Sequence, residues 1–304
     1  MDAKNAYQLV YSEVKKHIAG NASIIELMFI GIVANGHCIL EGVPGVAKTV
    51  MTKALSDAID AKFARVQGTV DLSMQDVLGY TYIDDADHSV KMKRGPIFTN
   101  ILLIDELNRT TAKTMAGLLE ALEERQVTIP GAPTEPLYSP FIAFATQNPL
   151  NIEGTISIPK VLSDRFLMRI AVTYPSNEQE QEMLRLKENE INVKTEKVIS
   201  IKDILQLQMD VNNVKMSDDI VGYITRLVDA TREDIHVVMG GSPRAEISFM
   251  QCAKAKALIE GRKEVSIDDI KFLAKPILSH RLVVRSTGGI GVNGVIDGIV
   301  ASIK

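Results

Sequence analysis

Short apolar runs alternate with longer amphipathic segments through the first half of the chain. Uninterrupted apolar runs are typical of strands that are buried on both faces of a sheet. The expected strands cover residues 37–40, 63–66, 101–104, 141–146 and 169–172. Helices are expected at 48–59 and 111–124, and this alternation predicts a parallel sheet with helices on both faces. Residues 68–100 are rich in Gly and Asp, and we expect an insertion with a hairpin there.

The ends of the chain read as helical. Helices are expected at 7–18 and 22–34, and no strand pattern follows Pro175. Beyond it, helix-start signals recur at Ser176, Ser217, Ser242 and Ser266, the first with the form of a capping box. The fold class is therefore α/β, with a parallel-sheet domain at 1–175 and a smaller all-helical domain at 176–304. The glycine-rich stretch 288–298 is expected to be a small tail after the last clear helix.

Composition narrows the class of protein. The 304 residues carry a net charge of -4, which argues against nucleic-acid binding through bulk positive charge. The two cysteines, Cys38 and Cys252, lack metal-site spacing and are expected to be buried, reduced thiols. The N-terminus lacks the apolar core of a signal peptide, and no apolar stretch is long enough to span a bilayer. We expect a cytoplasmic protein with no membrane insertion.

A glycine-rich segment between the first expected strand and the next helix matches GxxxxGK[ST], except that Ala47 replaces the last glycine. Backbone N–H groups of such a loop wrap phosphates, the lysine Lys48 would contact the β- and γ-phosphates, and the hydroxyl of Thr49 would bind Mg²⁺. Ala47 is tolerable there if its φ is negative. The alternative is a plain turn before an ordinary helix. The residues expected to contact ATP are Gly42, Val43, Pro44, Gly45, Val46, Ala47, Lys48, Thr49 and Val50.

Polar residues follow the next two buried strands. Asp105 and Glu106 end the run 101–104, and Asn148 ends the run 141–146. Adjacent carboxylates at a strand end repel each other unless a cation compensates them. In a phosphate-loop enzyme Asp105 would hold Mg²⁺, Glu106 would polarise the attacking water, and Asn148 would orient that water or contact the γ-phosphate. The alternatives are a solvated loop start for the acids and an Asx-turn before Pro149 for Asn148.

Two arginines are candidates for contact with phosphate. Arg165 lies between an apolar helix end and a strand, where a buried arginine is costly without an anion. Arg244 lies in the first turn of a helix, where the helix dipole disfavours a cation and a phosphate would offset that. The alternatives are a salt bridge of Arg165 with Asp164 or another carboxylate, and an ordinary surface role for Arg244. Arg109 is a further candidate for a contact between subunits, and the alternative is a solvated surface side chain.

The order of these motifs resembles the MoxR family of AAA+ ATPases. The resemblance runs from about residue 20 to 285 and includes the segments 41–49, 104–109, 118–128, 145–149, 163–167 and 241–245. It implies Walker A at Lys48 and Thr49, Walker B at Asp105 and Glu106, sensor 1 at Asn148, sensor 2 at Arg244 and an arginine finger at Arg165. It also implies hexameric rings and partners such as von Willebrand factor A domain proteins. Residues 69–79 and 151–160 depart from the family pattern, which leaves the partner in doubt.

The leading hypothesis is an ATPase that remodels partner proteins, with ATP and Mg²⁺ as cofactors. Glu106 would polarise a water that attacks a γ-phosphate held by Lys48, Mg²⁺ and Arg244 of the same chain, while Arg165 would come from a neighbouring subunit. One alternative is a binding module that ATP gates, with incidental hydrolysis. Another is a DNA-linked motor, although no basic stripe supports it.

Overall fold

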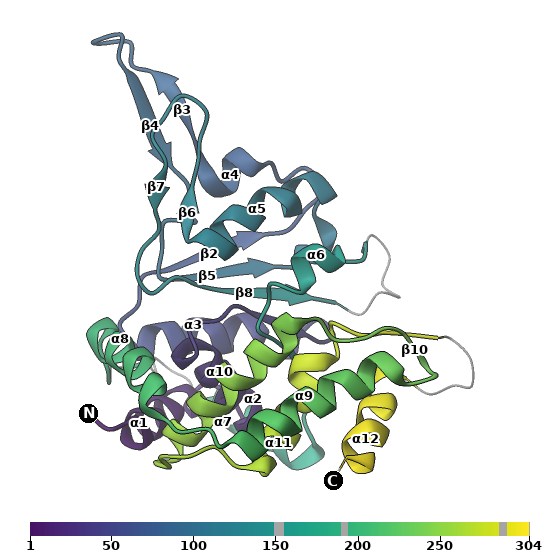
Figure 1. Cartoon of the computed structure of the whole chain (residues 1–304). Coiled ribbons are helices and arrows are strands. Elements are labelled where there is room, and N and C mark those ends of the chain that lie inside the picture. The colour runs from purple at the N-terminus through teal and green to yellow at the C-terminus, as the bar shows by residue number, and fades with distance from the viewer. Residues whose placement is uncertain (149–154, 190–193, 286–290, 304) are drawn as a thin grey trace.

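The computed structural model describes residues 1–148, 155–189, 194–285 and 291–303. A five-stranded parallel sheet runs through its centre (Figure 1), with the strand order β2-β5-β8-β1-β9. Its strands are β1 (Cys38–Glu41), β2 (Phe63–Gln67), β5 (Ile101–Asp105), β8 (Ile142–Gln147) and β9 (Met168–Ala171). All five expected strands are therefore present, and they are parallel as predicted.

Successive residues of each central strand serve two different cores. Leu103 and Phe144 face one apolar cluster, while Leu102 and Ala143 face the other. Both sets are buried, because side chains alternate across a strand and this sheet is covered on both faces. Uninterrupted apolar runs are the consequence. The helices of the two layers are α1 (Ala3–Lys15), α2 (Ala22–Val33) and α3 (Lys48–Ala58) on the first face, and α4 (Met74–Leu78), α5 (Ala112–Glu124) and α6 (Lys160–Ser163) on the second.

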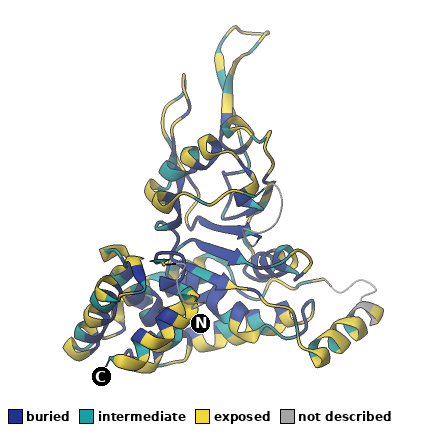
Figure 2. Cartoon of the chain, turned by 90° about the vertical axis from the view of Figure 1, so that its right-hand side faces the viewer, coloured by how far each residue is buried: buried dark blue, intermediate teal, exposed yellow. Residues whose placement is uncertain are grey.

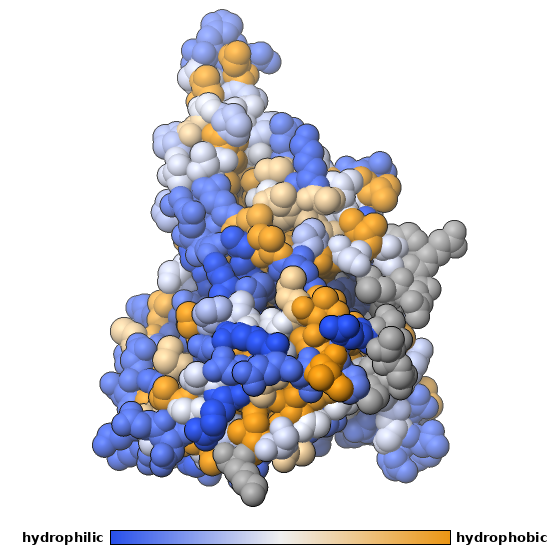
Figure 3. All heavy atoms as spheres, turned by 45° about the vertical axis from the view of Figure 1, so that its right-hand side comes forward, coloured by the Kyte–Doolittle hydropathy of each residue, from blue (hydrophilic) through white to orange (hydrophobic). Residues whose placement is uncertain are grey.

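Two hairpins project from the second layer (Figure 1). One pairs β3 (Gly79–Ile83) with β4 (Val90–Arg94), which confirms the hairpin expected in the insertion. The other pairs β6 (Gln126–Val127) with β7 (Glu135–Pro136) and was not predicted. Much of the projection is exposed (Figure 2), and apolar side chains interrupt its hydrophilic surface (Figure 3). Ile83 and Val90 at the tip of the longer hairpin are 66% and 62% exposed.

The C-terminal part is helical, as predicted, but it differs from the expectation in three details. It contains a short antiparallel pair of strands, β10 (Val237–Met239) and β11 (Val283–Val284), so it is not all-helical. The tail forms a helix, α12, because its buried Val295, Ile296 and Ile299 supply an apolar face; residues 286–290 of that stretch lie outside the described residues. An unpredicted helix, α8, begins after the capping pair Ser200 and Asp203. The helices here are α7 (Asn177–Asn189), α8 (Ile201–Asp210), α9 (Asp218–Glu233), α10 (Pro243–Ile259), α11 (Ile267–Leu278) and α12 (Val292–Ser302).

The helical part packs tightly on the sheet domain. Helix α10 lies against α1 and α2, and α11 lies against β9. The apolar cluster on that face extends without a break from α1 into α11 and α12. A boundary at residue 175 stays a prediction. Among the described residues, no helix combines the length and the hydrophobicity that crossing a bilayer requires.

Candidate active site

The glycine-rich loop joins the carboxyl end of β1 to the start of α3, as the motif requires. It borders a cavity of about 480 Å³, which is within the usual range for small-molecule sites. Pro44 to Val50 line this cavity together with Asp105, Glu106 and Asn148. Gly42 and Val43 precede the lining residues, and their carbonyl groups turn toward Lys48. The predicted loop, acidic pair and amide therefore converge on one cavity.

Two positions in the loop have left-handed backbone. Gly45 has a φ of +87°, which glycine adopts freely. Ala47 has a φ of 60°, so the condition of a negative φ, under which a methyl group is tolerated there, is not met. A side-chain-bearing residue in this conformation costs about 1–2 kcal/mol. The strain persists because the residue must turn the chain from the loop into α3.

Lys48 is buried at the base of the cavity. Its Nζ donates to the carbonyl oxygens of Gly42 and Val43 and to Asn148 Oδ1, the last at 3.3 Å. Burial lowers its pKa from the ordinary value, and the nearby Asp105 and Glu106 oppose that shift. The ammonium group is therefore partly desolvated and held at the mouth of the loop, where a phosphate oxygen would compete for its protons.

Asp105 ends β5, and its carboxylate binds three side chains. Its Oδ1 accepts a hydrogen bond from Thr146 Oγ1 at 2.6 Å, and its Oδ2 accepts one from Thr49 Oγ1 at 3.1 Å. Arg65 on the edge strand β2 forms an ion pair with Oδ2 at 2.7 Å. A hydroxyl and a carboxylate in contact are the hard oxygen donors that Mg²⁺ prefers, alongside water and phosphate. The donor set of Thr49 and Asp105 fits the predicted metal.

Glu106 and Asn148 are paired at the neighbouring strand ends. Asn148 Nδ2 donates to Glu106 Oε1 at 2.9 Å, while Asn148 Oδ1 accepts from Lys48. The buried Asn108 holds the backbone of Asn148 from both sides, donating to its carbonyl at 3.0 Å and accepting from its N–H at 3.3 Å. One amide thus joins the lysine to the acid that the hydrolysis of a phosphate would use as base. The alternative Asx-turn of Asn148 concerns Pro149, which lies outside the described residues.

The two predicted arginines lie elsewhere. Arg165 Nε forms an ion pair with Glu123 Oε2 at 2.5 Å, and Arg244 binds the other oxygen of the same carboxylate. They border a second cavity of about 470 Å³, which Gly36 and His37 also line. Those two residues precede β1, whereas the phosphate loop follows it, so the two cavities lie at opposite ends of that strand.

This arrangement corrects one expectation and sharpens another. Arg244 was expected beside Lys48 of its own chain, but the start of α10 places it on Glu123, at the cavity that Gly36 and His37 line before β1. Arg165 forms the salt bridge that was its alternative, although with Glu123 rather than with Asp164. Arg109 pairs with Glu106 Oε2 at 3.2 Å in the same chain.

Several residues of the site escape reasoning from sequence. Thr146 and Arg65 carry a signal in hindsight, because each lies on a strand next to β5, Thr146 near the carboxyl end of β8 and Arg65 in the middle of β2. Asn108 carries a weaker one, since the sequence shows only a short polar residue two positions after Glu106. Glu123 has no readable signal at all, because only the tertiary fold brings it to both arginines.

Comparison with known proteins places the chain among AAA ATPases. Residues 37–168 match the ATPase family associated with various cellular activities (AAA), and residues 229–290 match the AAA lid domain. Chaperone MoxR1 of Mycobacterium tuberculosis is 37% identical over 281 residues, which cover 90% of this chain and 74% of that protein. The chain belongs to the MoxR family of AAA+ ATPases.

The similarity to two other proteins covers nearly the whole of this MoxR-family chain. Uncharacterized protein YeaC of Bacillus subtilis is 39% identical over 295 residues, covering 96% of this chain and 92% of that protein. A crystal structure of a "putative ATPase" from Cytophaga hutchinsonii superposes with a TM-score of 0.90 at 36% identity, covering 99% of this chain and 95% of that one. This MoxR-family chain is an ATPase, and the family predicted from its motifs is confirmed.

Proposed function

We propose that this ATPase hydrolyses Mg²⁺-bound ATP at a site shared by two copies of the chain and uses the reaction to remodel partner proteins. The observation that carries the proposal is the separation of Arg165 and Arg244 from the phosphate loop. Strand β1 has four residues and is about 13 Å long at ~3.3 Å per residue. Arginines at its amino end cannot contact a phosphate at its carboxyl end, but they can contact the phosphate of a neighbouring copy.

Each residue of the site then has a defined task. The loop N–H groups and Lys48 hold the phosphates, and Thr49 and Asp105 hold the metal ion, which supplies positive charge against the phosphates. Glu106 accepts a proton from the attacking water, and Asn148 fixes the position of that carboxylate. Arg165 and Arg244 of the next copy stabilise the charge of the transition state, a contribution of about 10³–10⁵ in rate for such arginines.

Both arginines must leave Glu123 to reach that phosphate. Glu123 keeps them together as a pair, so one approach of the neighbouring copy delivers two positive charges. We therefore assign Arg244 to the same side of the interface as Arg165. Copies joined in this way form a ring, which we propose is hexameric, in the cytoplasm.

The remodelling role rests on the projecting hairpin. Exposed Tyr82, Ile83 and Val90 near its end offer apolar contacts for a protein partner, with Ile83 and Val90 paired across the two strands. MoxR1, which is 37% identical, is named a chaperone. We propose a protein client, of the von Willebrand factor A domain class, and no role for nucleic acid.

The test is steady-state ATPase activity measured against protein concentration. A shared site predicts specific activity that rises with concentration and then saturates. Arg165→Ala and Arg244→Ala should each abolish the rise while leaving ATP binding intact, because neither residue lines its own nucleotide cavity. Specific activity that is flat with concentration and survives both substitutions would refute the shared site.

A further inference from the structure

Arg281 is a buried cation at a junction of three elements. It lies just beyond the end of α11, and its side chain is only 2% exposed. Buried arginines are costly unless their charge and all their N–H donors are satisfied. Arg281 meets that requirement with acceptors on α11, on α10 and on the turn between α6 and β9. Arg281 also lines the second cavity, which Arg165 and Arg244 border, and the hydrolysis described above does not use it.

Most of its acceptors flank Arg165. Arg281 Nε forms an ion pair with Asp164 Oδ1 at 3.0 Å. Its Nη2 donates to the carbonyl of Phe166 at 2.8 Å, and its Nη1 donates to the carbonyl of Leu167 at 3.2 Å. The residues immediately before and after Arg165 are thus fixed by one planar guanidinium, which restricts the backbone from which the Arg165 side chain extends.

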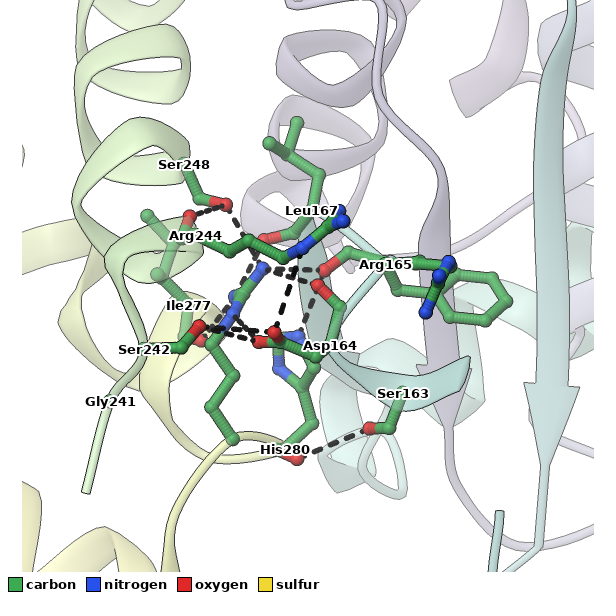
Figure 4. Close-up of polar contacts among 12 residues, drawn as sticks. Ser163, Asp164, Arg165, Leu167, Gly241, Ser242, Arg244, Ser248, Ile277 and His280 are labelled. Carbon is green, nitrogen blue, oxygen red and sulfur yellow. Dashed lines mark hydrogen bonds and ion pairs between the residues drawn. The ribbon is translucent and has the colours of Figure 1, made fainter. Parts of the chain in front are cut away.

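A further hydrogen bond of Arg281 connects it to Arg244 through Ser248. Arg281 Nη2 donates to Ser248 Oγ at 2.9 Å, and the Ser248 hydroxyl donates to the carbonyl of Arg244 at 2.8 Å (Figure 4). Ser248 lies one helical turn after Arg244 on α10. Arg281 therefore reaches the backbone of both arginines, that of Arg165 through its neighbours and that of Arg244 through one hydroxyl.

Asp164 completes the connection from the other side. Its carboxylate accepts hydrogen bonds from Ser242 Oγ at 3.2 and 3.0 Å (Figure 4). Ser242 is the N-cap residue of α10, yet its side chain does not cap that helix. A serine at this position normally bonds the helix N–H groups and stabilises the helix start. Here its hydroxyl is used to tie the start of α10 to the turn that carries Arg165.

We propose that Arg281 is a positioning residue that fixes Arg165 and Arg244 as one rigid pair for the neighbouring active site. The inference rests on the proposed shared site and adds to it the residue that sets the geometry of the two donors. A lysine in its place keeps the charge but has one nitrogen, so it cannot bond Asp164, the two carbonyls and Ser248 together. Loss of the fixed geometry should reduce turnover, because a misplacement of about 1 Å can cost 10²-fold.

The experiment uses the full chain with Arg281→Lys. We expect kcat to fall by about 10- to 100-fold, with the Kd for a fluorescent ATP analogue within about twofold of wild type. The decisive measurement mixes this variant with Glu106→Gln. The first has an intact nucleotide site and disordered arginines, and the second has intact arginines and no catalytic base. Mixed assemblies should hydrolyse ATP faster than either variant alone.

Two further variants guard against trivial loss of folding. Ser248→Ala removes one bond of the junction and should give a smaller fall in kcat with the same gain on mixing. Arg262→Lys is the matched control, because Arg262 forms ion pairs with Glu260 and Asp269 in the same helical part and contacts neither arginine. It should lower the unfolding temperature while leaving kcat near wild type.

The outcomes separate the two proposals. A gain when Arg165→Ala is mixed with Glu106→Gln, without a gain for Arg281→Lys or Ser248→Ala, would keep the shared site and overturn the role of Arg281. Unchanged kcat in folded Arg281→Lys would also overturn it. If the Arg165→Ala mixture itself shows no gain, the shared site fails, and the inference fails with it.

Discussion

Glu123→Gln is expected to make assembly into the active form easier. In the single chain, each oxygen of the Glu123 carboxylate holds one of the two arginines. The hydrogen bond from Arg244 is the largest of the effects that lower the pKa of this carboxyl group below its ordinary value. The Glu123 carboxyl group is therefore ionised near neutral pH. An arginine that leaves for a neighbouring phosphate must first break its bond to Glu123. Glutamine has the same size and lacks the charge that holds both guanidinium groups.

The size of the effect follows from the exposure of these groups. Glu123 is 36% exposed, and such partly solvated pairs contribute about 0.2–1 kcal/mol each. Two pairs therefore stabilise the unassembled state by roughly 0.4–2 kcal/mol. Removing that stabilisation shifts the association equilibrium toward the assembled state. At about 1.4 kcal/mol per factor of ten, the protein concentration for half-maximal ATPase activity should fall by roughly 2- to 30-fold.

The assay is specific ATPase activity over a dilution series at saturating ATP, with particle size followed by light scattering. Glu124→Gln is the matched control, because it removes the same charge from the adjacent residue, whose carboxylate accepts from Gln126 and not from either arginine. Its midpoint should stay at the wild-type value. A midpoint for Glu123→Gln that is unchanged or higher would refute the view that Glu123 holds the arginines in reserve.

Three further predictions follow from the site and the core. Asn108→Ala leaves the backbone of Asn148 without its two partners and should lower kcat by about 10- to 100-fold with little change in ATP affinity, measured by single-turnover kinetics and analogue binding. Ala47→Gly should raise the free energy of unfolding by about 1 kcal/mol, read from denaturant titration, because glycine relieves the positive φ; a loss would contradict the strain. Acidification should destabilise the fold, because burial holds the pKa of His37 and His280 well below the ordinary value in the folded state only. As the pH falls, the unfolded chain therefore binds protons before the folded chain does. The free energy of unfolding should fall by about 1 kcal/mol per histidine between pH 7 and 5.5, and its dependence on pH should be weaker in His37→Asn.

The hydrogen bonds of His37 also indicate that acidification lowers the free energy of unfolding, independently of the burial of this residue. Its Nδ1 accepts the N–H of Ala143 at 2.9 Å, so this nitrogen carries no proton. Its Nε2 lies 2.9 Å from the carbonyl of Leu122 and donates to it. Both bonds are satisfied only by the neutral ring. Protonation would place a second N–H against that of Ala143.

The sheet and the phosphate loop could be predicted because their signals are local. A strand buried on both faces has to be apolar throughout, and a phosphate loop needs its glycines and lysine at fixed spacing. α8 has an equally local signal in Ser200 and Asp203, which form a capping box. Elements that close a buried core are therefore largely specified within their own segments.

The position of Arg244 could not be predicted in this way. Its own turn is predictable from Ser242 and Pro243, but the edge of the sheet that it faces depends on how the whole helical part docks. That docking depends on apolar contacts among α1, α2, α10 and α11, which are distant in sequence. The roles of Glu123 and Arg281 could not be predicted for the same reason, because each residue acquires its partners only when those contacts form.

The four residues of β1 separate the two halves of the machinery by the length of one strand, and this polarity limits how copies can associate. A two-fold dimer that pairs arginine edges brings together two donors and no phosphate. A head-to-tail contact joins a donor edge to a phosphate edge, and repeated contacts of this kind build either a closed ring or an open chain. An open chain always ends in one phosphate site that no arginine reaches, whereas closure completes every site. The fraction of working sites therefore reports whether the assembly has closed.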